Sequence, residues 1–390
     1  MKSDKNVEKT AVVYWPFSVF KDVHLKKDIG GLSLSFRDMG YKTTLIVGNF
    51  HSTKIVGVDV YETGNSHHKI LNPLTQANEF IKVMKKLLRL SPDIVITYNR
   101  NPFFSVITIL YKLTNIFKLK KRPRSKFIIK MDSDGNFRFT NFPPRIFEHT
   151  NFLKILNFLV AVTLKINYFS SDYISIETEC GLEKIKKILH KERKLRVVPN
   201  GCALGYFGNP LEEVRNKESV ILAVSRVVRQ KSLETLIEAF AQVSKDFPGW
   251  SFKIAGEIED LNYYEELTKI TRTLDVENKV TFEGAVSEHK LLELYSISSI
   301  FCLSSNWEGD SIARIEAMGA GLPVITTEAG CGQSLEKYGS IVVPIGDSIS
   351  FASGLKRLMS DVRLRKEISA SQKAAVVSWD DVAKRYINME

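Results

Sequence analysis

Residues 300–326 read IFCLSSNWEGDSIARIEAMGAGLPVIT. The apolar runs Ile300–Leu303 and Val324–Thr326 are typical of short buried strands. Between them the pattern predicts a polar loop and then a helix of about two turns. Two parallel strands need a crossover connection, which is usually helical. The segment therefore predicts one repeating unit of a parallel sheet.

The loop and helix of this segment carry two carboxylates on either side of a helix start. Glu308 lies in the loop and Glu316 lies in the helix. Asp310 or Ser311 can act as the N-cap, which leaves the next backbone amides free to hold an anion. A strand end, a helix start suited to an anion and two carboxylates together predict a binding site for a sugar nucleotide.

Apolar runs alternate with helical patterns along the whole chain. This alternation predicts parallel sheets covered on both faces, and two consecutive sets predict two Rossmann-like α/β domains. The expected boundary is the turn sequence Pro199-Asn200-Gly201. The runs are Ala11–Tyr14, Thr44–Val47, Asp93–Thr97, Lys126–Met131, Tyr173–Ile176 and Leu195–Val198, then Val220–Val224, Phe252–Ala255, Val280–Phe282, Ile300–Leu303, Val324–Thr326 and Ile341–Val343.

The composition is that of an ordinary globular protein. The 390 residues are 44% hydrophobic and 25% charged, enough for two domains with their own cores. The four cysteines show no metal-ligand spacing, which favours a reducing compartment and argues against structural zinc. The polar N-terminus does not resemble a signal peptide, and no apolar run is long enough to span a membrane. We expect a cytoplasmic protein.

The net charge of +11 is unevenly distributed. Residues 1–200 hold 34 Lys and Arg against 17 Asp and Glu, whereas residues 201–390 hold 21 against 27. Residues 94–131 contain no acid, which favours an anionic partner such as lipid headgroups, a polyanionic acceptor or nucleic acid, or else a merely solvated basic face. The bases of this stretch are Arg100, Lys112, Lys118, Lys120, Lys121, Arg122, Arg124, Lys126 and Lys130.

The segment 151–166 is mostly apolar and is charged only at Lys154 and Lys165. It is too short to span a bilayer. One interpretation is a core helix packed on the N-terminal sheet. The alternative is an interfacial helix that docks the domain on an anionic membrane together with the basic stretch before it.

Two cations follow the first expected strand of the C-terminal half. Arg226 comes directly after Ser225, and Lys231 precedes the helical pattern that begins at Leu233. Ligands of open parallel sheets bind beyond the carboxyl ends of the strands. Arg226, Lys231 and the loop at Glu308 are therefore expected to share one cleft, where two cations and a helix start would neutralise a diphosphate. Glu316 would accept hydrogen bonds from a ribose.

The chain resembles the retaining family 4 glycosyltransferases of GT-B fold, in which two Rossmann-like domains face each other across a cleft. The resemblance is carried, in the family's order, by Val197–Gly201, Ser225-Arg226 with Lys231, Gly284–Ser287, and Glu308–Glu316 with Gly321-Leu322-Pro323. It implies that Arg226 and Lys231 bind the donor diphosphate and that Glu316 holds the ribose. The other implied donor contacts are Glu308, Gly309, Asp310, Ser311 and Ile312 at the sugar or phosphate, and Val286 at the base.

This resemblance also implies the domain organisation. Residues 1–199 would form the basic acceptor domain and residues 200–372 the donor domain. Residues 373–390, with Trp379 and Tyr386, would form a helix that crosses back to the first domain.

The motifs of the family are weaker in the N-terminal half. Gly30-Gly31 lies inside an expected helix, so a donor-binding role for it does not follow. Asp132 occupies the place where many members carry a catalytic His, and Glu308 and Asp132 are the catalytic candidates. Asp132-Ser133-Asp134 also spells a metal-binding D-x-D, which leaves metal binding, a substrate contact and a plain turn as alternatives. The isolated His24 is interpreted as a surface residue rather than a catalytic one.

The resemblance implies a retaining hexosyltransferase that needs neither cofactor nor metal. It would move a sugar from a nucleotide-diphosphate sugar to a glycan or lipid-linked acceptor, in envelope or exopolysaccharide synthesis. Peripheral contact with the inner face of the cell membrane is expected, and nucleic acid is not an expected partner. The alternatives are a sugar-nucleotide epimerase, a glycosyl phosphorylase, or a non-catalytic module that binds nucleic acid or anionic membrane.

Overall fold

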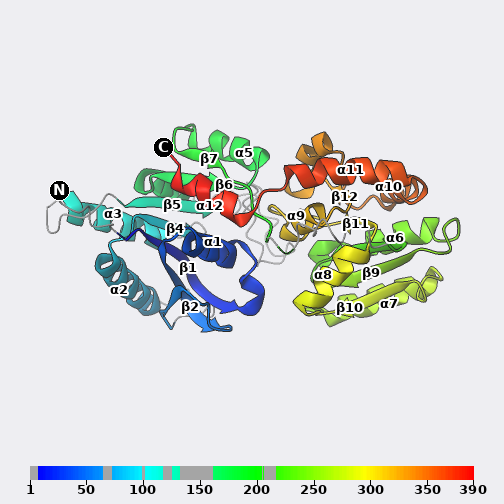
Figure 1. Cartoon of the computed structure of the whole chain (residues 1–390), viewed down its shortest axis with the longest axis horizontal. Helices are drawn as coiled ribbons and strands as arrows, with labels where there is room; N and C mark the ends of the chain where they lie inside the picture. Colours follow the sequence, from blue (N-terminus) through cyan, green and yellow to red (C-terminus); the bar gives the residue numbers. More distant parts are fainter. Residues whose placement is uncertain are drawn as a thin grey trace, which may run out of the picture. The chain divides into compact units, whose positions relative to one another are not determined.

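The computed structural model describes residues 8–64, 73–98, 102–116, 125–131, 161–203, 205 and 217–390. Asp132, Asp134, Arg100, residues 118–124 and the first part of the apolar segment, residues 151–160, lie outside these ranges. The chain folds into two compact units, and the second is inserted into the first. Unit 1 contains residues 1–199 and 379–390, and unit 2 contains residues 200–378 (Figure 1).

Unit 1 is built on a seven-stranded sheet with the order β3-β2-β1-β4-β5-β6-β7. All of its pairs are parallel. The order reverses between β1 and β4, and this reversal is the switch point where open parallel sheets bind ligands. The strands are β1 (Thr10–Lys21), β2 (Lys42–His51), β3 (Val58–Glu62), β4 (Ile94–Tyr98), β5 (Lys126–Met131), β6 (Tyr173–Ile176) and β7 (Leu195–Val197).

Unit 2 repeats this plan with a six-stranded parallel sheet of order β10-β9-β8-β11-β12-β13. Alternate residues of β8 enter different cores, since Ile221 and Ala223 pack in one cluster and Leu222 packs in the other. This alternation shows that the sheet is buried on both faces. The strands are β8 (Val220–Val224), β9 (Ser251–Ala255), β10 (Val280–Gly284), β11 (Ile300–Leu303), β12 (Val324–Thr327) and β13 (Ile341–Val343).

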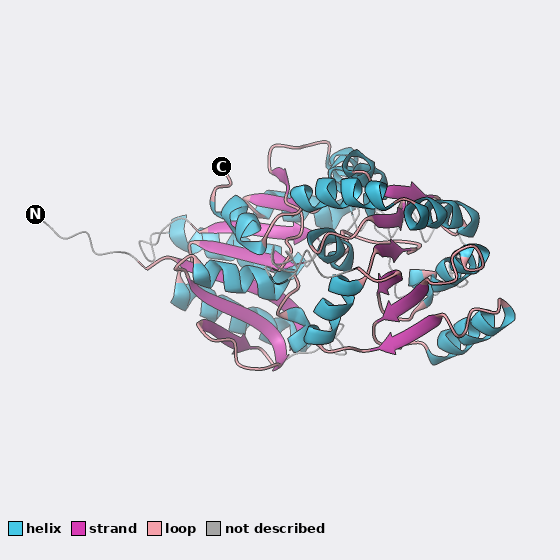
Figure 2. Ribbon diagram, turned by 45° about the vertical axis from the view of Figure 1, so that its right-hand side comes forward, coloured by secondary structure: helices cyan, strands magenta, loops and turns pink. Residues whose placement is uncertain are grey.

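Helices cover both sheets, as the cyan ribbons around the magenta strands show in Figure 2. In unit 1 they are α1 (Asp28–Asp38), α2 (Pro73–Leu90), α3 (Pro102–Ile116), a helical segment at 161–170, α5 (Glu179–Leu189) and α12 (Trp379–Ile387). In unit 2 they are α6 (Leu233–Val243), α7 (Leu261–Thr273), α8 (Glu288–Ile297), α9 (Ile312–Gly319), α10 (Ser348–Ser360) and α11 (Val362–Ala375).

Every apolar run that predicted a strand forms one, although some boundaries shift. The strand β3 was not predicted, because Asp59 and Glu62 interrupt its apolar run and are exposed at the sheet edge. The predicted boundary after residue 372 falls inside α11, and the chain returns to unit 1 only at Trp379. Helix α11 continues past that point because its residues Ile368 and Gln372 are buried within unit 2.

Helix α12 completes unit 1 by packing on α1, where Figure 1 shows it in red beside the blue helix. The contact depends on Gly31, because a Cβ at this position would lie 2.5 Å from Cδ1 of the Trp379 ring. The Trp379 indole Nε1 donates a hydrogen bond to Lys26 O at 3.1 Å. Gly30 is equally constrained, since its Cβ would lie 2.3 Å from His24 O. Gly30-Gly31 therefore serves close packing at the start of α1.

We predict that Gly31→Ala destabilises the protein by roughly 1–3 kcal/mol, the range for inserting a methyl group into a well-packed core. The added methyl group would displace the Trp379 ring from α1. Denaturant unfolding measures the loss. Gly249→Ala is the control, because a Cβ there meets no atom within 4 Å. Equal stability of the two variants would contradict the proposed packing constraint.

Candidate functional site

The segment between β11 and β12 forms a loop and helix α9, as its sequence predicts. Ser311 is the N-cap of α9, and its hydroxyl accepts a hydrogen bond from Arg314 N at 3.4 Å. Of the two alternative caps, Ser311 is therefore the one used. The first-turn amides of a helix have no partners within the helix and attract anions. The start of α9 thus provides the expected anion-binding element.

Asp310 has a different role, since it joins the loop to the beginning of unit 2. Its carboxylate accepts a hydrogen bond from Asn200 N at 3.2 Å and forms an ion pair with Arg314 at 3.0 Å. The Asn200 side chain also donates to Asp310 O at 3.2 Å. Arg314 is only 2% exposed, so its pairing with Asp310 takes place in the interior. These contacts fix the position of the loop just before α9.

Lys231 and Glu308 form an ion pair between the turn after β8 and the loop after β11. Their side chains are 13% and 11% exposed, which makes the pair largely inaccessible to solvent. Ser305 Oγ donates a second hydrogen bond to Glu308 Oε1 at 2.6 Å. Because an uncompensated buried charge is costly, each member holds the other in place. The structure therefore brings together two of the residues predicted from separate motifs.

Backbone contacts hold the turn and the loop together around this pair. Asn306 N donates to Gln230 O at 2.9 Å, and Gln230 Nε2 donates to Trp307 O at 2.9 Å. Gly330 approaches the loop so closely that a Cβ would lie 2.2 Å from Gly309 O. Its φ of +61° also favours glycine. The loop at Glu308 is thus fixed from two sides.

Arg226 lies at the carboxyl end of β8 but is not part of this pair. Its guanidinium forms an ion pair with Glu259 at 2.8 Å, and its side chain is 52% exposed. The ends of β8 and β9 approach closely here, because a Cβ on Gly256 would lie 1.9 Å from Ser225 O. An exposed, flexible cation at a strand end is suited to contact a phosphate. The pairing of Arg226 with Lys231 at one ligand stays a prediction.

Glu316 is buried in α9, where its carboxylate accepts a hydrogen bond from Tyr295 Oη at 3.1 Å. Burial, followed by the negative charge of Glu316, raises the pKa of the Cys202 thiol. Val286 is half-buried and packs against the same apolar cluster as Tyr295 and Met318. The residues predicted for the ribose and the base therefore lie on elements that share one core.

The site includes two residues that the sequence did not single out. Tyr295 binds Glu316, and Ser305 binds Glu308. Ser305, the second residue after the strand Ile300–Leu303, was available as a signal, because polar residues that follow a buried strand lie at the ligand-binding edge. No comparable signal marks Tyr295, which occupies an ordinary position in the helical pattern of α8.

In unit 1 a buried ion cluster lies at the carboxyl ends of β5 and β6. The fully buried ammonium of Lys130 lies 3.2 Å from Asp28 Oδ2 and 2.5 Å from Glu177 Oε1. It also lies 5.5 Å from the centre of the Tyr98 ring. Lys130 lies near the end of β5, and its ion pairs fix this end of the strand. The catalytic candidate Asp132 is the first residue after β5 in the sequence.

His24 follows β1 and is half-buried beside two aromatic rings. Its ring lies 4.9 Å from the Trp15 ring and 5.5 Å from the Phe20 ring, measured between centres. Its Nδ1 accepts a hydrogen bond from Lys21 N at 2.8 Å. Burial, followed by the positive charge of Lys27, lowers the pKa of His24 to about 4. His24 is thus half-buried beside two aromatic rings, and its interpretation as a surface rather than a catalytic residue stays a prediction.

We predict that His24 makes the protein less stable as the pH falls from 6.5 towards about 4. In this window the unfolded chain takes up a proton at His24 and the folded protein does not, so acid favours unfolding, by roughly 1–2 kcal/mol once solvent screening of the partly exposed ring is included. Asn offers an acceptor in place of Nδ1 and does not titrate. His24→Asn should therefore flatten the pH dependence of denaturant unfolding.

The control for this experiment is His51→Asn, which changes an exposed histidine of the same unit. It should retain the wild-type pH dependence. If the free energy of unfolding of His24→Asn depended on pH as strongly as that of the wild type, a neutral His24 in the folded protein would be contradicted.

Among the described residues, no group of three or more His, Cys, Asp or Glu side chains is arranged to hold a metal ion. The D-x-D sequence at 132–134 lies outside those residues, so its three alternatives remain open.

Comparison with known proteins shows similarity to glycosyltransferases, which includes most of unit 2. Residues 211–374 match the family model described as glycosyl transferases group 1. An uncharacterized glycosyltransferase of Methanocaldococcus jannaschii is 30% identical over 244 residues, which are 56% of this chain and 61% of the relative. The alpha-monoglucosyldiacylglycerol synthase of Streptococcus pneumoniae is 28% identical over 161 residues, which are 37% of this chain and 36% of the relative. The matched region thus covers less than two thirds of either relative.

Comparison with solved structures extends over both units. The crystal structure of Anabaena HepE in complex with UDP matches 96% of this chain and 98% of its own, with a TM-score of 0.70 and 15% identity. The two parallel-sheet units define the GT-B fold, which confirms the predicted fold class. The match of residues 211–374 to the glycosyl transferases group 1 agrees with the resemblance that the motifs indicate.

Proposed function

We propose that the protein is a retaining hexosyltransferase that transfers a sugar from a nucleotide-diphosphate sugar to a glycan or lipid-linked acceptor. The observation that carries this proposal is the buried Lys231–Glu308 pair beside the capped start of α9. It places a cation, a carboxylate and a helix N-terminus together at the ligand-binding edge of a Rossmann-like sheet.

The donor diphosphate is proposed to bind to Lys231, Arg226 and the amides at the start of α9. Together they supply two positive charges and a helix dipole to a leaving group of two phosphates. Preorganised cations of this kind stabilise the charge that develops on the leaving group. We propose that they do so without a metal ion. The solved Anabaena protein, which shares the fold, was crystallised with UDP.

Glu308 is proposed to position the donor sugar and to stabilise developing positive charge. Its pairing with Lys231 and Ser305 fixes the direction of the carboxylate, which suits electrostatic stabilisation better than attack. In a retaining reaction of this type, the leaving phosphate accepts the acceptor's proton on the face that it leaves. Glu316, held by Tyr295, is proposed to accept the ribose hydroxyls.

The acceptor is proposed to bind unit 1, whose sequence carries the excess of positive charge. A lipid-linked acceptor of envelope or exopolysaccharide synthesis would bring an anionic membrane close to this unit. The related Streptococcus pneumoniae synthase is named for a glucosyldiacylglycerol product, which supports an acceptor of this class. We propose peripheral contact with the cytoplasmic face of the membrane. No helix of the described residues is long and apolar enough to cross it.

We predict that Lys231→Ala and Glu308→Ala each lower sugar transfer by at least about 10²-fold, the scale of removing a preorganised electrostatic group. Removing either member also leaves the other charge buried without its partner. Transfer is measured by release of nucleoside diphosphate, with folding checked by circular dichroism. The matched control is Lys253→Ala, which breaks a partly buried pair with Glu283 in the same sheet.

Near-wild-type transfer by both site variants would contradict the site assignment. Donor binding is measured separately by thermal shift with a panel of sugar nucleotides, because ligand binding to the folded state raises its stability. If no sugar nucleotide of the panel raised the melting temperature, the result would instead favour the alternative of a non-catalytic binding module.

The stereochemistry of the product provides a second prediction. The anomeric configuration observed by NMR should match that of the donor, and nucleotide should be released only when an acceptor is present. An inverted product would contradict the retaining mechanism. Release of nucleotide without any acceptor would favour an epimerase, and phosphate-dependent breakdown of a glycan would favour a phosphorylase.

A further inference from the structure

Two neighbouring helices of unit 1 expose apolar faces to solvent. On α3 the exposed residues are Val106, Ile109 and Leu110, with exposures of 45%, 43% and 40%. On the helical segment 161–170 they are Val162, Ile166 and Phe169, with exposures of 36%, 39% and 66%. In both helices these positions follow the spacing of one helical face, so each helix presents an apolar stripe.

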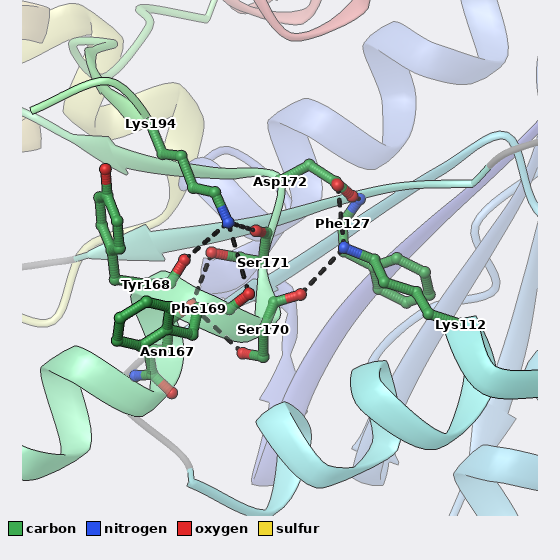
Figure 3. A network of polar contacts seen from close by, with 9 residues as sticks. All are labelled: Lys112, Phe127, Asn167, Tyr168, Phe169, Ser170, Ser171, Asp172 and Lys194. Carbon is green, nitrogen blue, oxygen red and sulfur yellow. Dashed lines mark hydrogen bonds and ion pairs between the residues drawn. The ribbon is translucent and has the colours of Figure 1, made fainter.

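Several polar residues of the two helices lie between them, in the interior. Ser105 Oγ donates a hydrogen bond to Asn167 Oδ1 at 2.5 Å, and both residues are buried. Lys112 Nζ donates to Ser170 O at 2.9 Å (Figure 3). A surface helix of a soluble protein normally has the opposite arrangement, with its polar face outward. Here the outward faces are the apolar ones.

Both apolar stripes point away from the same face of the sheet. Phe127 of β5 packs with Phe104 and Tyr111 of α3. Ile129, two positions further along the same strand, packs in one cluster with Leu164 of the helical segment. Residues two apart in a strand point to the same side. The six exposed side chains therefore belong to one layer, which we name the α3/161–170 face.

Cations border this face at the end of the helical segment. Lys191 Nζ lies 4.6 Å from the centre of the Phe169 ring, and Lys194 Nζ donates to Tyr168 O and Ser171 O at 2.9 and 2.7 Å (Figure 3). Lys165 is exposed between the apolar positions. The nearby acids are engaged, since Asp172 pairs with Lys112 and Glu192 pairs with Lys186. The border of the face is thus cationic.

We propose that the α3/161–170 face is the surface with which unit 1 docks on an anionic lipid bilayer. Its apolar side chains would enter the boundary between headgroups and acyl chains, with Phe169 as the most exposed anchor. Lys165 and Lys191 would contact the lipid phosphates, since lysine side chains extend their charge from an apolar stem. The proposal deepens the proposed membrane-linked acceptor by naming the residues that make the contact.

Charge favours a bilayer over a second copy of the chain. A symmetric dimer through this face would place the same patch against itself, so the lysines of both copies would gather in one interface. Like charges at close range repel. An anionic membrane instead supplies both an apolar layer and negative charge. In charge and apolar character, the α3/161–170 face is therefore complementary to an anionic bilayer and not to a second copy of the same face.

The experiment is co-sedimentation of the full chain with vesicles of phosphatidylcholine alone or mixed with phosphatidylglycerol. The wild type should bind the mixed vesicles and be released as salt rises. The triple variant Ile109→Ser, Ile166→Ser and Phe169→Ser should bind at least about tenfold more weakly, because it removes three apolar contacts. The double variant Lys165→Glu and Lys191→Glu should lose its preference for phosphatidylglycerol.

Matched controls change equally exposed residues elsewhere. Val56→Ser, Ile81→Ser and Leu261→Ser replace three exposed apolar side chains, and Lys245→Glu with Lys366→Glu reverses two exposed charges. Both controls should bind vesicles as the wild type does. Wild-type protein that fails to bind mixed vesicles, or a triple variant that binds as its control does, would overturn the proposal.

Two further measurements distinguish membrane docking from self-association and from donor binding. If the triple variant changes the oligomeric state in sedimentation velocity but keeps vesicle binding, the face is a contact between copies and the proposal is wrong. Donor binding by thermal shift should be unchanged in the triple variant, because all three substitutions lie in unit 1. Vesicle binding by a wild type that binds no sugar nucleotide would contradict the proposed transferase and leave this docking surface standing.

Discussion

The constraint on which the structure depends is that both parallel sheets are buried on both faces. A central strand in such a sheet holds mainly apolar side chains along its length, as β4 and β11 do. Polar side chains that act on a ligand must therefore follow the strands. This explains why Lys231, Glu308 and Asp310 in unit 2 and Lys130 in unit 1 all lie at or beyond carboxyl ends of strands.

A buried ion pair at such an edge combines structural and chemical roles. Lys231 and Glu308 hold two loops in register, and each depends on the other for compensation of its charge. A diphosphate that approaches Lys231 competes for the same ammonium group. We therefore propose that the ion pair between Lys231 and Glu308 weakens when the donor binds, because Lys231 then also contacts the diphosphate. Asp310 and Asn200, in contrast, fix the loop through contacts within the protein.

The pattern of apolar runs was sufficient to predict the fold, because buried strands and amphipathic helices have distinct periods. It missed Val58–Glu62, whose apolar run is interrupted by Asp59 and Glu62, both exposed at the edge of the sheet. The motifs predicted which residues surround the donor site, but not their partners. Glu316 with Tyr295, and Asp310 with Asn200, meet only through the tertiary fold. For the same reason, the contacts of His24 with two aromatic rings and the contact of Gly31 with Trp379 were not predicted.

The insertion of unit 2 between two parts of unit 1 has a consequence for biosynthesis. Residues 200–378 are contiguous, so this unit has all of its strands and helices as soon as they leave the ribosome. Unit 1 begins first, yet it waits for α12 to cover α1. During that interval the groove at Gly31 is open to water and to other chains. Translation speed and chaperones would therefore act mainly on the N-terminal unit, in spite of its earlier synthesis.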